Sequence, residues 1–464
     1  MPDMIIKSGK GNNPLGKKTI TMLLFSISVI VNVLIIISVK DFSLLSMAGS
    51  LILVSACCLL LYLFLLHFRK DILEVSRKVL FILAVITFFI FITRLVLENS
   101  DINIIYLVPF ALIPVLIRTF YDARLALFIL LITLILTGFL LLDPFKFIII
   151  NILAGIVAIL SLSNINRRYK ILFSAIVVTI TYFVVYLAFE AGAVDKISEI
   201  NTGCFKWFAG NGILILTGYP VISLFEHRFY FLSDSTLLEL SDSGSPLLRR
   251  LAEEAPGSYQ HSLQVANLAE AAARAIGANV LLARTGSLYH DIGKIKSPGY
   301  FIENQNSESS PHIDLDPFES SKVIIKHVEE GVRLASQFKL PVQIIDFIRT
   351  HHGTSKAYYF YRKYLESGVN SKSLEDNFQY KGPKPVSKEM AIVIMADAVE
   401  AASRTLEKHN EESIDELVER TIIFQEAEDQ FSDAPLTFRD ISDIKAVFKK
   451  RLSNIYHSRI AYPV

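Results

Sequence analysis

The sequence is poor in cysteine and has no excess of either charge. Cys57 and Cys58 lie in one apolar run and Cys204 stands alone, so neither a disulfide framework nor a thiolate metal site is expected. Lysine and arginine number 46 against 45 aspartates and glutamates, which leaves a net charge of +1. A near-neutral total neither supports nor excludes a nucleic-acid partner, because it can conceal basic loops.

Hydrophobic residues are distributed unevenly. They make up 52% of the 464 residues, and the mean hydropathy of +0.44 is high for a soluble protein. Nearly all of the excess precedes residue 228, whereas the remainder has the charge density of an ordinary globular domain. A membrane-spanning helix needs about 20 mostly apolar residues. Eight segments qualify: 19–39, 45–67, 79–98, 102–122, 125–143, 146–165, 171–190 and 205–226.

These segments predict a polytopic helical bundle. The alternative, buried helices of a large soluble core, would require many consecutive charge-free helices of this length. The first segment has no small-residue cleavage signal and more spans follow it, so we expect an anchor rather than a removed signal peptide.

Charges in the loops predict the orientation. Alternate loops are basic, and those between them are acidic. The basic residues are Lys7, Lys10, Lys17, Lys18, Arg69, Lys70, Arg77, Lys78, Arg118, Arg124, Arg167, Arg168 and Lys170; the acidic ones are Asp41, Glu98, Asp101, Asp143, Glu190, Asp195 and Glu199. The positive-inside rule places the N-terminus in the cytoplasm. An even number of spans then places the C-terminal half there as well.

The second half carries histidines and aspartates on successive helical patterns. His261 begins one pattern, and the adjacent pair His290-Asp291 ends the next. His327 shares a face with apolar residues, the pair His351-His352 ends a fourth pattern, and Asp397 lies within the apolar run 391–399. Five of the ten histidines belong to this set.

This combination of side chains predicts a metal centre. A single inward histidine is usually a hydrogen-bonded core residue, but five histidines and two aspartates make that explanation improbable for the whole set. An ionised Asp397 in its apolar run would cost several kcal/mol unless it were paired or metal-bound. Imidazole and carboxylate ligands suit Fe, Mn or Zn, and one carboxylate can bridge two ions.

The pattern His261…His290-Asp291…Asp397 resembles that of HD phosphohydrolases. Its surroundings are similar to the 7TM-HD family of bacterial membrane-bound cyclic di-AMP phosphodiesterases. The similar strings lie at 246–256, 259–262, 300–305, 351–354 and 382–385. That family usually has a large extracellular sensory domain between its first span and the next seven. Here about six residues, near 39–44, occupy that place, so the chain is either a shortened member or one from which the module has been removed.

The resemblance implies an all-α fold and a site with two divalent metal ions, Mn or Fe. One ion would be held by His261, His290, Asp291 and Asp397, and the other by Asp291, His327, His351 and His352. Asp291 and Lys294 would be catalytic, with Lys294 holding phosphate oxygens, and Arg404 is a second candidate for substrate binding. Five further side chains could stack on adenine or simply pack: Tyr300, Asn304, Tyr358, Tyr359 and Tyr361.

We therefore expect five regions. They are a cytoplasmic tail (1–18), a first span with a short external turn (19–44), a seven-span bundle (45–228), a helical connector (229–258) and a cytosolic HD phosphohydrolase domain (259–464). The expected location is the bacterial plasma membrane.

The expected reaction is hydrolysis of cyclic di-AMP to the linear dinucleotide pApA, regulated through the bundle. Two alternatives stay open. One is cyclic di-GMP hydrolysis of the HD-GYP type, which shares the His-Asp-Ile-Gly-Lys segment, and the other is a nucleotide-binding receptor without turnover. The expected partners are the cyclic dinucleotide and the lipid bilayer; a homodimer stays open, and no nucleic-acid polymer is expected.

Overall fold

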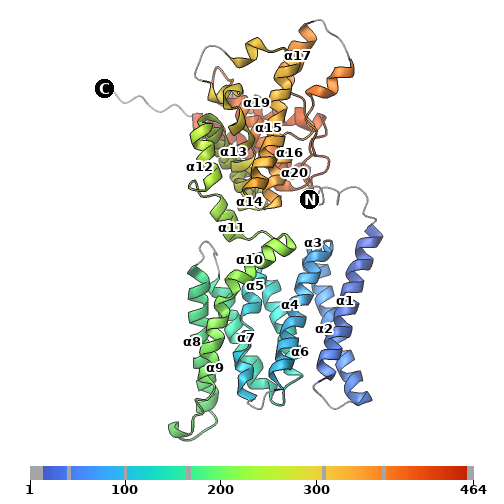
Figure 1. Ribbon diagram of the computed structural model, residues 1–464, viewed down its shortest axis with the longest axis vertical. Coiled ribbons are helices and arrows are strands. Elements are labelled where there is room, and N and C mark those ends of the chain that lie inside the picture. The colour runs from blue at the N-terminus through green and yellow to red at the C-terminus, as the bar shows by residue number, and fades with distance from the viewer. Residues whose placement is uncertain are drawn as a thin grey trace, which may run out of the picture. The chain divides into compact units, whose positions relative to one another are not determined.

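The computed structural model describes residues 14–38, 43–98, 102–162, 169–305, 310–367 and 372–456. Within these ranges the regular elements are all helical, and one isolated bridge joins Lys356 to Gln379. The predicted all-α fold is therefore confirmed. The chain divides into two compact units, residues 1–235 and 236–464 (Figure 1). Some residues used for the orientation lie outside the described ranges: Lys7, Lys10, Asp41, Asp101, Arg167 and Arg168.

The first unit is a bundle of apolar helices. In chain order they are α1 (Pro14–Ile37), α2 (Leu44–Phe68), α3 (Lys70–Leu73), α4 (Ser76–Val96), η3 (Ile102–Leu107), α5 (Leu112–Phe120), α6 (Ala123–Gly138), α7 (Pro144–Ser161), α8 (Tyr169–Ala191), η4 (Ile197–Glu199), α9 (Phe205–Leu216) and α10 (Gly218–Phe229).

Among the described residues of this unit, seven stretches are long and apolar enough to cross a membrane. They are Lys18–Ile37, Leu44–Phe68, Ser76–Val96, Asn103–Phe120, Pro144–Ser161, Ile171–Ala191 and Phe205–Glu226. The remaining sequence segment, 125–143, forms the 16-residue helix α6, which at 1.5 Å per residue is only about 24 Å long. It is shorter than expected because the helix ends at Gly138, and residues 139–143 form turns before α7 begins at Pro144.

A proline interrupts one of these spans. Pro109 separates η3 from α5, which leaves backbone carbonyls without helical partners. Asn211 on α9 donates hydrogen bonds of 2.9 Å from its Nδ2 to the carbonyls of Tyr106 and Val108. A break inside a bilayer is tolerated only where such groups are satisfied within the protein.

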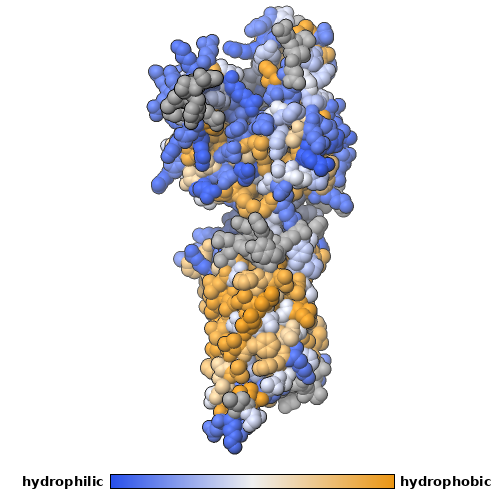
Figure 2. Space-filling view, turned by 90° about the vertical axis from the view of Figure 1, so that its left-hand side faces the viewer, coloured by the Kyte–Doolittle hydropathy of each residue, from blue (hydrophilic) through white to orange (hydrophobic). Residues whose placement is uncertain are grey.

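The outer surface of this unit is apolar. Leu34 is 64% exposed, Ile52 70% and Leu160 65%, and Figure 2 shows hydrophobic residues covering the body of the unit. Exposed apolar area of this extent indicates contact with lipid rather than water. The first unit is therefore a membrane bundle.

The second unit is built from shorter, amphipathic helices. They are α11 (Asp234–Leu240), which begins at the boundary between the units, α12 (Pro246–Glu254), α13 (Pro256–Ala275), α14 (Val280–Tyr289), η5 (Ile292–Lys296), η6 (Pro298–Tyr300), η7 (Ile302–Asn304), η8 (Pro311–Asp314), α15 (Pro317–Gln337), α16 (Val342–Thr350), α17 (Tyr358–Glu366), η9 (Lys372–Phe378), α18 (Lys388–Ser403), α19 (Glu411–Ala427) and α20 (Phe438–Tyr456).

Helix α18 forms the centre of this unit. It packs against α13, α14, α16, α19 and α20. Apart from Ala398, every residue from Met390 to Glu400 is buried. This position explains the apolar run that carries Asp397, because a helix surrounded on most sides has little polar surface.

The ends of the helices follow the capping residues in the sequence. Asp316 accepts a hydrogen bond from the Glu319 N–H at the start of α15, and Asn279 accepts one from Leu282 at the start of α14. Pro246 occupies the first turn of α12, whose leucines at 247, 248 and 251 are buried. These residues fix where each helix starts.

Candidate metal centre and active site

Five helical segments bring the seven predicted ligand residues together. α13 supplies His261, the end of α14 supplies His290 and Asp291, α15 supplies His327, the end of α16 supplies His351 and His352, and α18 supplies Asp397. Five of these residues are at most 5% exposed, and Asp397 is 8% exposed. A cluster of ionisable groups this deeply buried requires compensation by mutual pairing or by cations.

A glycine allows the central loop to reach α15. An added Cβ at Gly293 would lie 1.8 Å from the carbonyl oxygen of His327. Only glycine permits this approach of η5 to α15. The contact brings the segment after Asp291 directly against the helix that carries His327.

The imidazoles and Asp397 form two groups. The first group is His261, His290 and Asp397, and the second group is His327, His351 and His352; within each group the candidate ligand atoms all lie within 4.8 Å of one another. These are the two sets that the resemblance implies, before Asp291 is added to each.

Asp291 lies between the two groups and faces each with a different oxygen. Its Oδ2 is 3.2 Å from Nε2 of His290 and 3.7 Å from Nε2 of His261. Its Oδ1 is 3.3 Å from Nε2 of His327 and 3.6 Å from Nε2 of His351. One carboxylate can therefore serve both groups, as a bridging ligand does.

Hydrogen bonds fix the orientation of the rings. Nδ1 of His290, His327 and His351 lies 2.6, 2.6 and 2.8 Å from the backbone carbonyl three residues earlier. A carbonyl oxygen can only accept, so Nδ1 carries the hydrogen and the lone pair of each Nε2 points toward Asp291. This is the orientation that partners outside the metal shell impose on ligating histidines.

Several of these inward-facing atoms have no hydrogen-bond partner. Nε2 of His290 and Oδ1 of Asp291 are buried without one. Nε2 of His327 and Nε2 of His351 lie 3.0 Å apart, although each Nδ1 already holds the ring hydrogen. Buried lone pairs that converge in this way are unfavourable unless a cation lies between them. The residues therefore fit divalent cations.

The charge states of four residues suit metal binding. Burial opposes the charge on Asp291 and Asp397, but neighbouring histidines, with Lys294 at Asp291, outweigh it and hold both pKa values well below the usual range. Burial lowers the pKa of His351 to about 4 and that of His352 well below its usual value. The carboxylates are thus ionised and these imidazoles neutral, as metal ligands must be.

His290 differs because two carboxylates face it. Burial disfavours its charged form, but Asp291 and Asp397 outweigh burial and raise its pKa to about 10. The carboxylates thus attract positive charge to this position. A divalent cation would supply that charge and displace the proton.

Lys294 and Arg404 lie at the edge of the cluster. Lys294 Nζ is 2.7 Å from Oδ2 of Asp291 and 2.8 Å from Oε1 of Glu303. Arg404 donates from Nε (2.9 Å) and Nη2 (2.6 Å) to Oε1 of Glu400. The other oxygen of Glu400 is hydrogen-bonded to Nδ1 of His261 at 2.5 Å.

Glu303 and Glu400 are not among the candidates chosen from the sequence. Glu400 follows Asp397 by three residues on α18, so helical spacing places both on one face. That spacing, with a second carboxylate in an apolar run, is a usable signal. Glu303 lies in the short η7 helix, where no periodicity singles it out.

A cleft of about 920 Å³ opens onto the cluster. It is lined by residues from the metal groups, including His261, His352 and Asp397, and by Lys294 and Arg404. Both predicted substrate-binding residues thus border the same cleft as the metal groups.

Of the five side chains considered for base stacking, Tyr358 lines this cleft. Tyr300 contacts His312, Asn304 is hydrogen-bonded to Ser258, and Tyr361 packs on Phe378. Tyr359 is 65% exposed. The structure therefore leaves Tyr358 as the candidate of this set that reaches the cleft.

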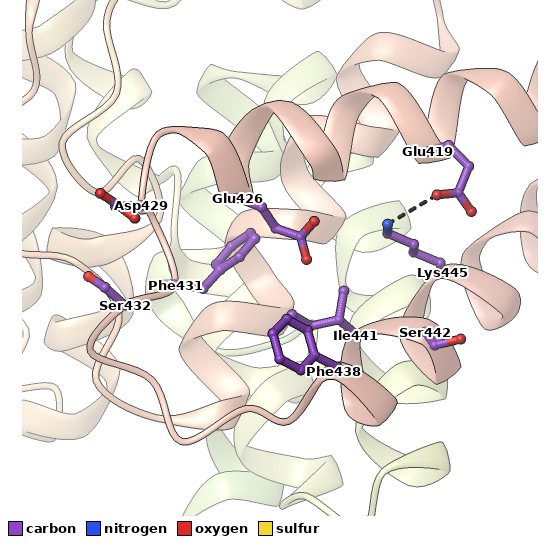
Figure 3. A pocket seen from close by; sticks show the side chains of 9 residues that line it. All are labelled: Glu419, Glu426, Asp429, Phe431, Ser432, Phe438, Ile441, Ser442 and Lys445. Atoms are coloured by element: carbon purple, nitrogen blue, oxygen red, sulfur yellow. Dashed lines mark hydrogen bonds and ion pairs between the residues drawn. The ribbon is translucent and has the colours of Figure 1, made fainter.

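A second cavity, of about 530 Å³, lies between α19 and the start of α20. Figure 3 shows Phe431, Phe438 and Ile441 among its lining side chains, and Glu419 paired with Lys445 at one end. Its lining residues include no histidine, and none of them belongs to the metal groups.

Comparison with known proteins agrees with this geometry. A family described as "7TM receptor with intracellular HD hydrolase" matches residues 44–233, and the HD domain family matches 258–402. The cyclic-di-AMP phosphodiesterase PgpH of Bacillus subtilis is 40% identical over 375 residues, covering 78% of this chain and 52% of the relative. PgpH of Listeria monocytogenes is 36% identical over 385 residues, covering 82% and 53%.

The solved HD domain of Listeria PgpH, in complex with cyclic-di-AMP, has 40% sequence identity. The match covers 46% of the present chain and 100% of the solved chain, with a TM-score of 0.45. The present chain spans about half the length of the curated relatives it matches. With one family matching the membrane unit and the other matching the unit that holds the metal groups, the chain belongs to the family of seven-transmembrane receptors with an intracellular HD hydrolase.

Proposed function

We propose that this protein is a metal-dependent phosphodiesterase that hydrolyses cyclic di-AMP to pApA. The observation that carries the proposal is the position of Asp291, which faces both histidine groups and Lys294 beside a cleft of about 920 Å³. The activity and ligand named for its relatives support this choice of substrate.

Two divalent cations would be held by the seven residues, with Asp291 shared between them. Imidazole and carboxylate donors suit Mn and Fe almost equally. When bound, such a pair neutralises phosphate oxygens and activates water for in-line attack on phosphorus. Hydrolysis then breaks one of the two phosphodiester bonds of the ring and leaves a linear dinucleotide with a terminal phosphate.

The protein's own side chains orient the phosphate. The ammonium of Lys294 reaches the cleft beside Asp291 and would hold a non-bridging phosphate oxygen. Arg404 borders the same cleft, but its guanidinium is hydrogen-bonded to Glu400. It would therefore contact substrate only while it also binds that carboxylate. Asp291 would link the two metal groups, because its two oxygens face one group each.

Two alternatives predict different outcomes. Cyclic di-GMP hydrolysis uses the same His-Asp-Ile-Gly-Lys segment, and the names of the relatives favour the adenine dinucleotide instead. A receptor without turnover would be expected to have lost a ligand, whereas all seven are present and grouped.

The test is turnover by the purified full chain with Mn or Fe, under anaerobic conditions, against a panel of cyclic dinucleotides. We expect conversion of cyclic di-AMP to pApA. Preferential cleavage of cyclic di-GMP would identify the first alternative. Binding without cleavage of any cyclic dinucleotide would identify the second.

We also propose that the protein lies in the bacterial plasma membrane with residues 236–464 in the cytoplasm. The basic residues around α3, namely Arg69, Lys70, Arg77 and Lys78, support this orientation. A reporter fused after Val464 should read as cytoplasmic. Labelling of that end by a membrane-impermeant reagent in intact cells would show the opposite orientation.

A further inference from the structure

Lys294 is held between two carboxylates from different segments. Its Nζ lies 2.7 Å from Asp291 and 2.8 Å from Glu303, and 4.9 Å from the centre of the Phe301 ring. The side chains of Lys294 and Glu303 are each 12% exposed. An ammonium this enclosed has few other positions available.

Glu303 is itself fixed by the first turn of α13. Ser258 donates from Oγ to Oε1 of Glu303 at 2.8 Å. Asn304 donates from Nδ2 to Oγ of Ser258 at 2.8 Å, and its Oδ1 accepts from the Ser258 N–H at 3.1 Å. Ser258 is completely buried. We call Ser258, Glu303 and Asn304 the clasp.

The backbone of the clasp is packed too closely for any side chain at Gly257. An added Cβ there would lie 1.8 Å from the carbonyl oxygen of Glu303 and 2.4 Å from its carbonyl carbon. Ser258 precedes His261 by three residues on the same helix. The clasp therefore ties the lysine to the helix that carries a ligand of the first group.

We propose that Glu303 is a positioning residue that keeps the ammonium of Lys294 at the cleft side of Asp291 when cations are bound. In the structure Oδ2 of Asp291 is one of the two anions that hold the lysine. The same oxygen faces His261 and His290, where a cation would bind, and that cation would repel the ammonium. Glu303 is then the remaining fixed negative charge that retains it.

This inference rests on the proposed function, because its purpose is to present Lys294 to a phosphate oxygen. Glu303→Gln keeps the size and an accepting oxygen for Ser258 but removes the charge. We expect about tenfold lower turnover and about tenfold weaker binding of inorganic phosphate, the lower end of what partners outside a metal shell contribute. Metal content should remain at the wild-type level.

The experiment is a double-mutant cycle in the full chain, with Lys294→Ala as the second change. If Glu303 acts through Lys294, adding Glu303→Gln to Lys294→Ala causes no further loss. The measurements are turnover of cyclic di-AMP, calorimetric affinity of the manganese-loaded protein for inorganic phosphate, metal content and thermal unfolding. Glu254→Gln is the matched control, because Glu254 pairs with Arg250 on the exposed face of α12, and it should change none of them.

Losses that multiply in the double variant would overturn the proposal, since Glu303 would then act independently of Lys294. Should Glu303→Gln unfold, Ser258→Ala replaces it: a smaller loss that disappears in the Lys294→Ala background supports the proposal, and a loss that persists there overturns it. Phosphate affinity separates this result from the proposed function. Wild-type protein that cleaves no cyclic dinucleotide refutes that function, while the phosphate cycle still tests Glu303.

Discussion

The two groups of the candidate metal centre differ in where their negative charge comes from. The first group contains Asp397, and Glu400 stands behind His261. The second group consists of three imidazoles, and the rings of His327 and His351 are oriented by backbone carbonyls. Oδ1 of Asp291 is the carboxylate oxygen that faces those two rings.

This difference predicts unequal metal affinities. Unit charges about 4 Å apart interact by about 4 kcal/mol at an effective dielectric constant of 20, which corresponds to about a thousandfold in binding. A cation in the first group would interact with the charges of Asp291 and Asp397. One in the second group would interact with Asp291 and, through the far oxygen of Asp397, which lies 3.7 Å from Nδ1 of His352, less directly with Asp397. We therefore expect it to dissociate first.

The largest effect should follow from removing Asp291, which both groups share. Asp291→Ala should lower turnover by more than about 10³-fold and release both ions, because each loses a charged ligand. Asp291→Asn should be nearly as damaging, since it keeps the volume but loses the charge. Turnover, elemental analysis and thermal unfolding are measured together. A variant that keeps both ions and near-normal turnover would place the chemistry elsewhere.

Removing one histidine from each group tests the comparison directly. His327→Ala leaves the second group with two imidazoles and should release its ion, so that about one equivalent remains. His261→Ala leaves His290, Asp397 and Asp291 in place, and should retain more metal than His327→Ala. Elemental analysis after dialysis against a weak chelator measures how much metal each variant retains. Equal losses, or the reverse order, would show that local charge does not rank the two groups.

Lys294→Ala should spare both ions and still reduce turnover about 10²–10³-fold, the scale seen when one charge-stabilising donor is lost. The reason is that Lys294 contacts Asp291 from the cleft side and is not itself a ligand. Rate and metal content are compared with those of Asp291→Ala. Loss of metal in Lys294→Ala would mean that the lysine has a structural role in the metal groups.

The sequence predicted much of this centre because helical periodicity determines which side chains point inward. Asp397 was identifiable from its apolar run, and capping residues such as Asn279 and Asp316 mark where the following helices begin. Contacts between residues distant in sequence left no such signal. The spacing of Glu400 places it on one face with Asp397, but no pattern predicts its hydrogen bond to His261, 139 positions away. Glu303 lies in a short η-helix without a repeating pattern.

In the membrane unit, too, the sequence predicts only part of the structure. Hydropathy identifies apolar stretches but does not locate their ends. Helix α6 ends at Gly138, although the apolar residues of the segment 125–143 continue to Leu142. Pro109 broke another span in the way its missing N–H predicts, but the compensating contact from Asn211 lies more than a hundred residues away.

The smallest expected effect belongs to Glu400, and it should be confined to the first group. Glu400 is 5% exposed and hydrogen-bonds Nδ1 of His261 while holding Arg404 with its other oxygen. Glu400→Gln should weaken metal affinity of the first group about 10- to 100-fold, the range for such partners, and leave the second group unchanged.

A competition titration with a chromophoric chelator resolves the two binding steps for Glu400→Gln. The matched control is Glu407→Gln, since Glu407 is an exposed acid in the loop after α18 and should not alter either step. Weakening of both steps by Glu400→Gln would indicate that the two groups are coupled through Asp291 more strongly than their separate charges suggest. Weaker metal binding at the first group alone would establish that the metal affinity of each group depends on its own surroundings.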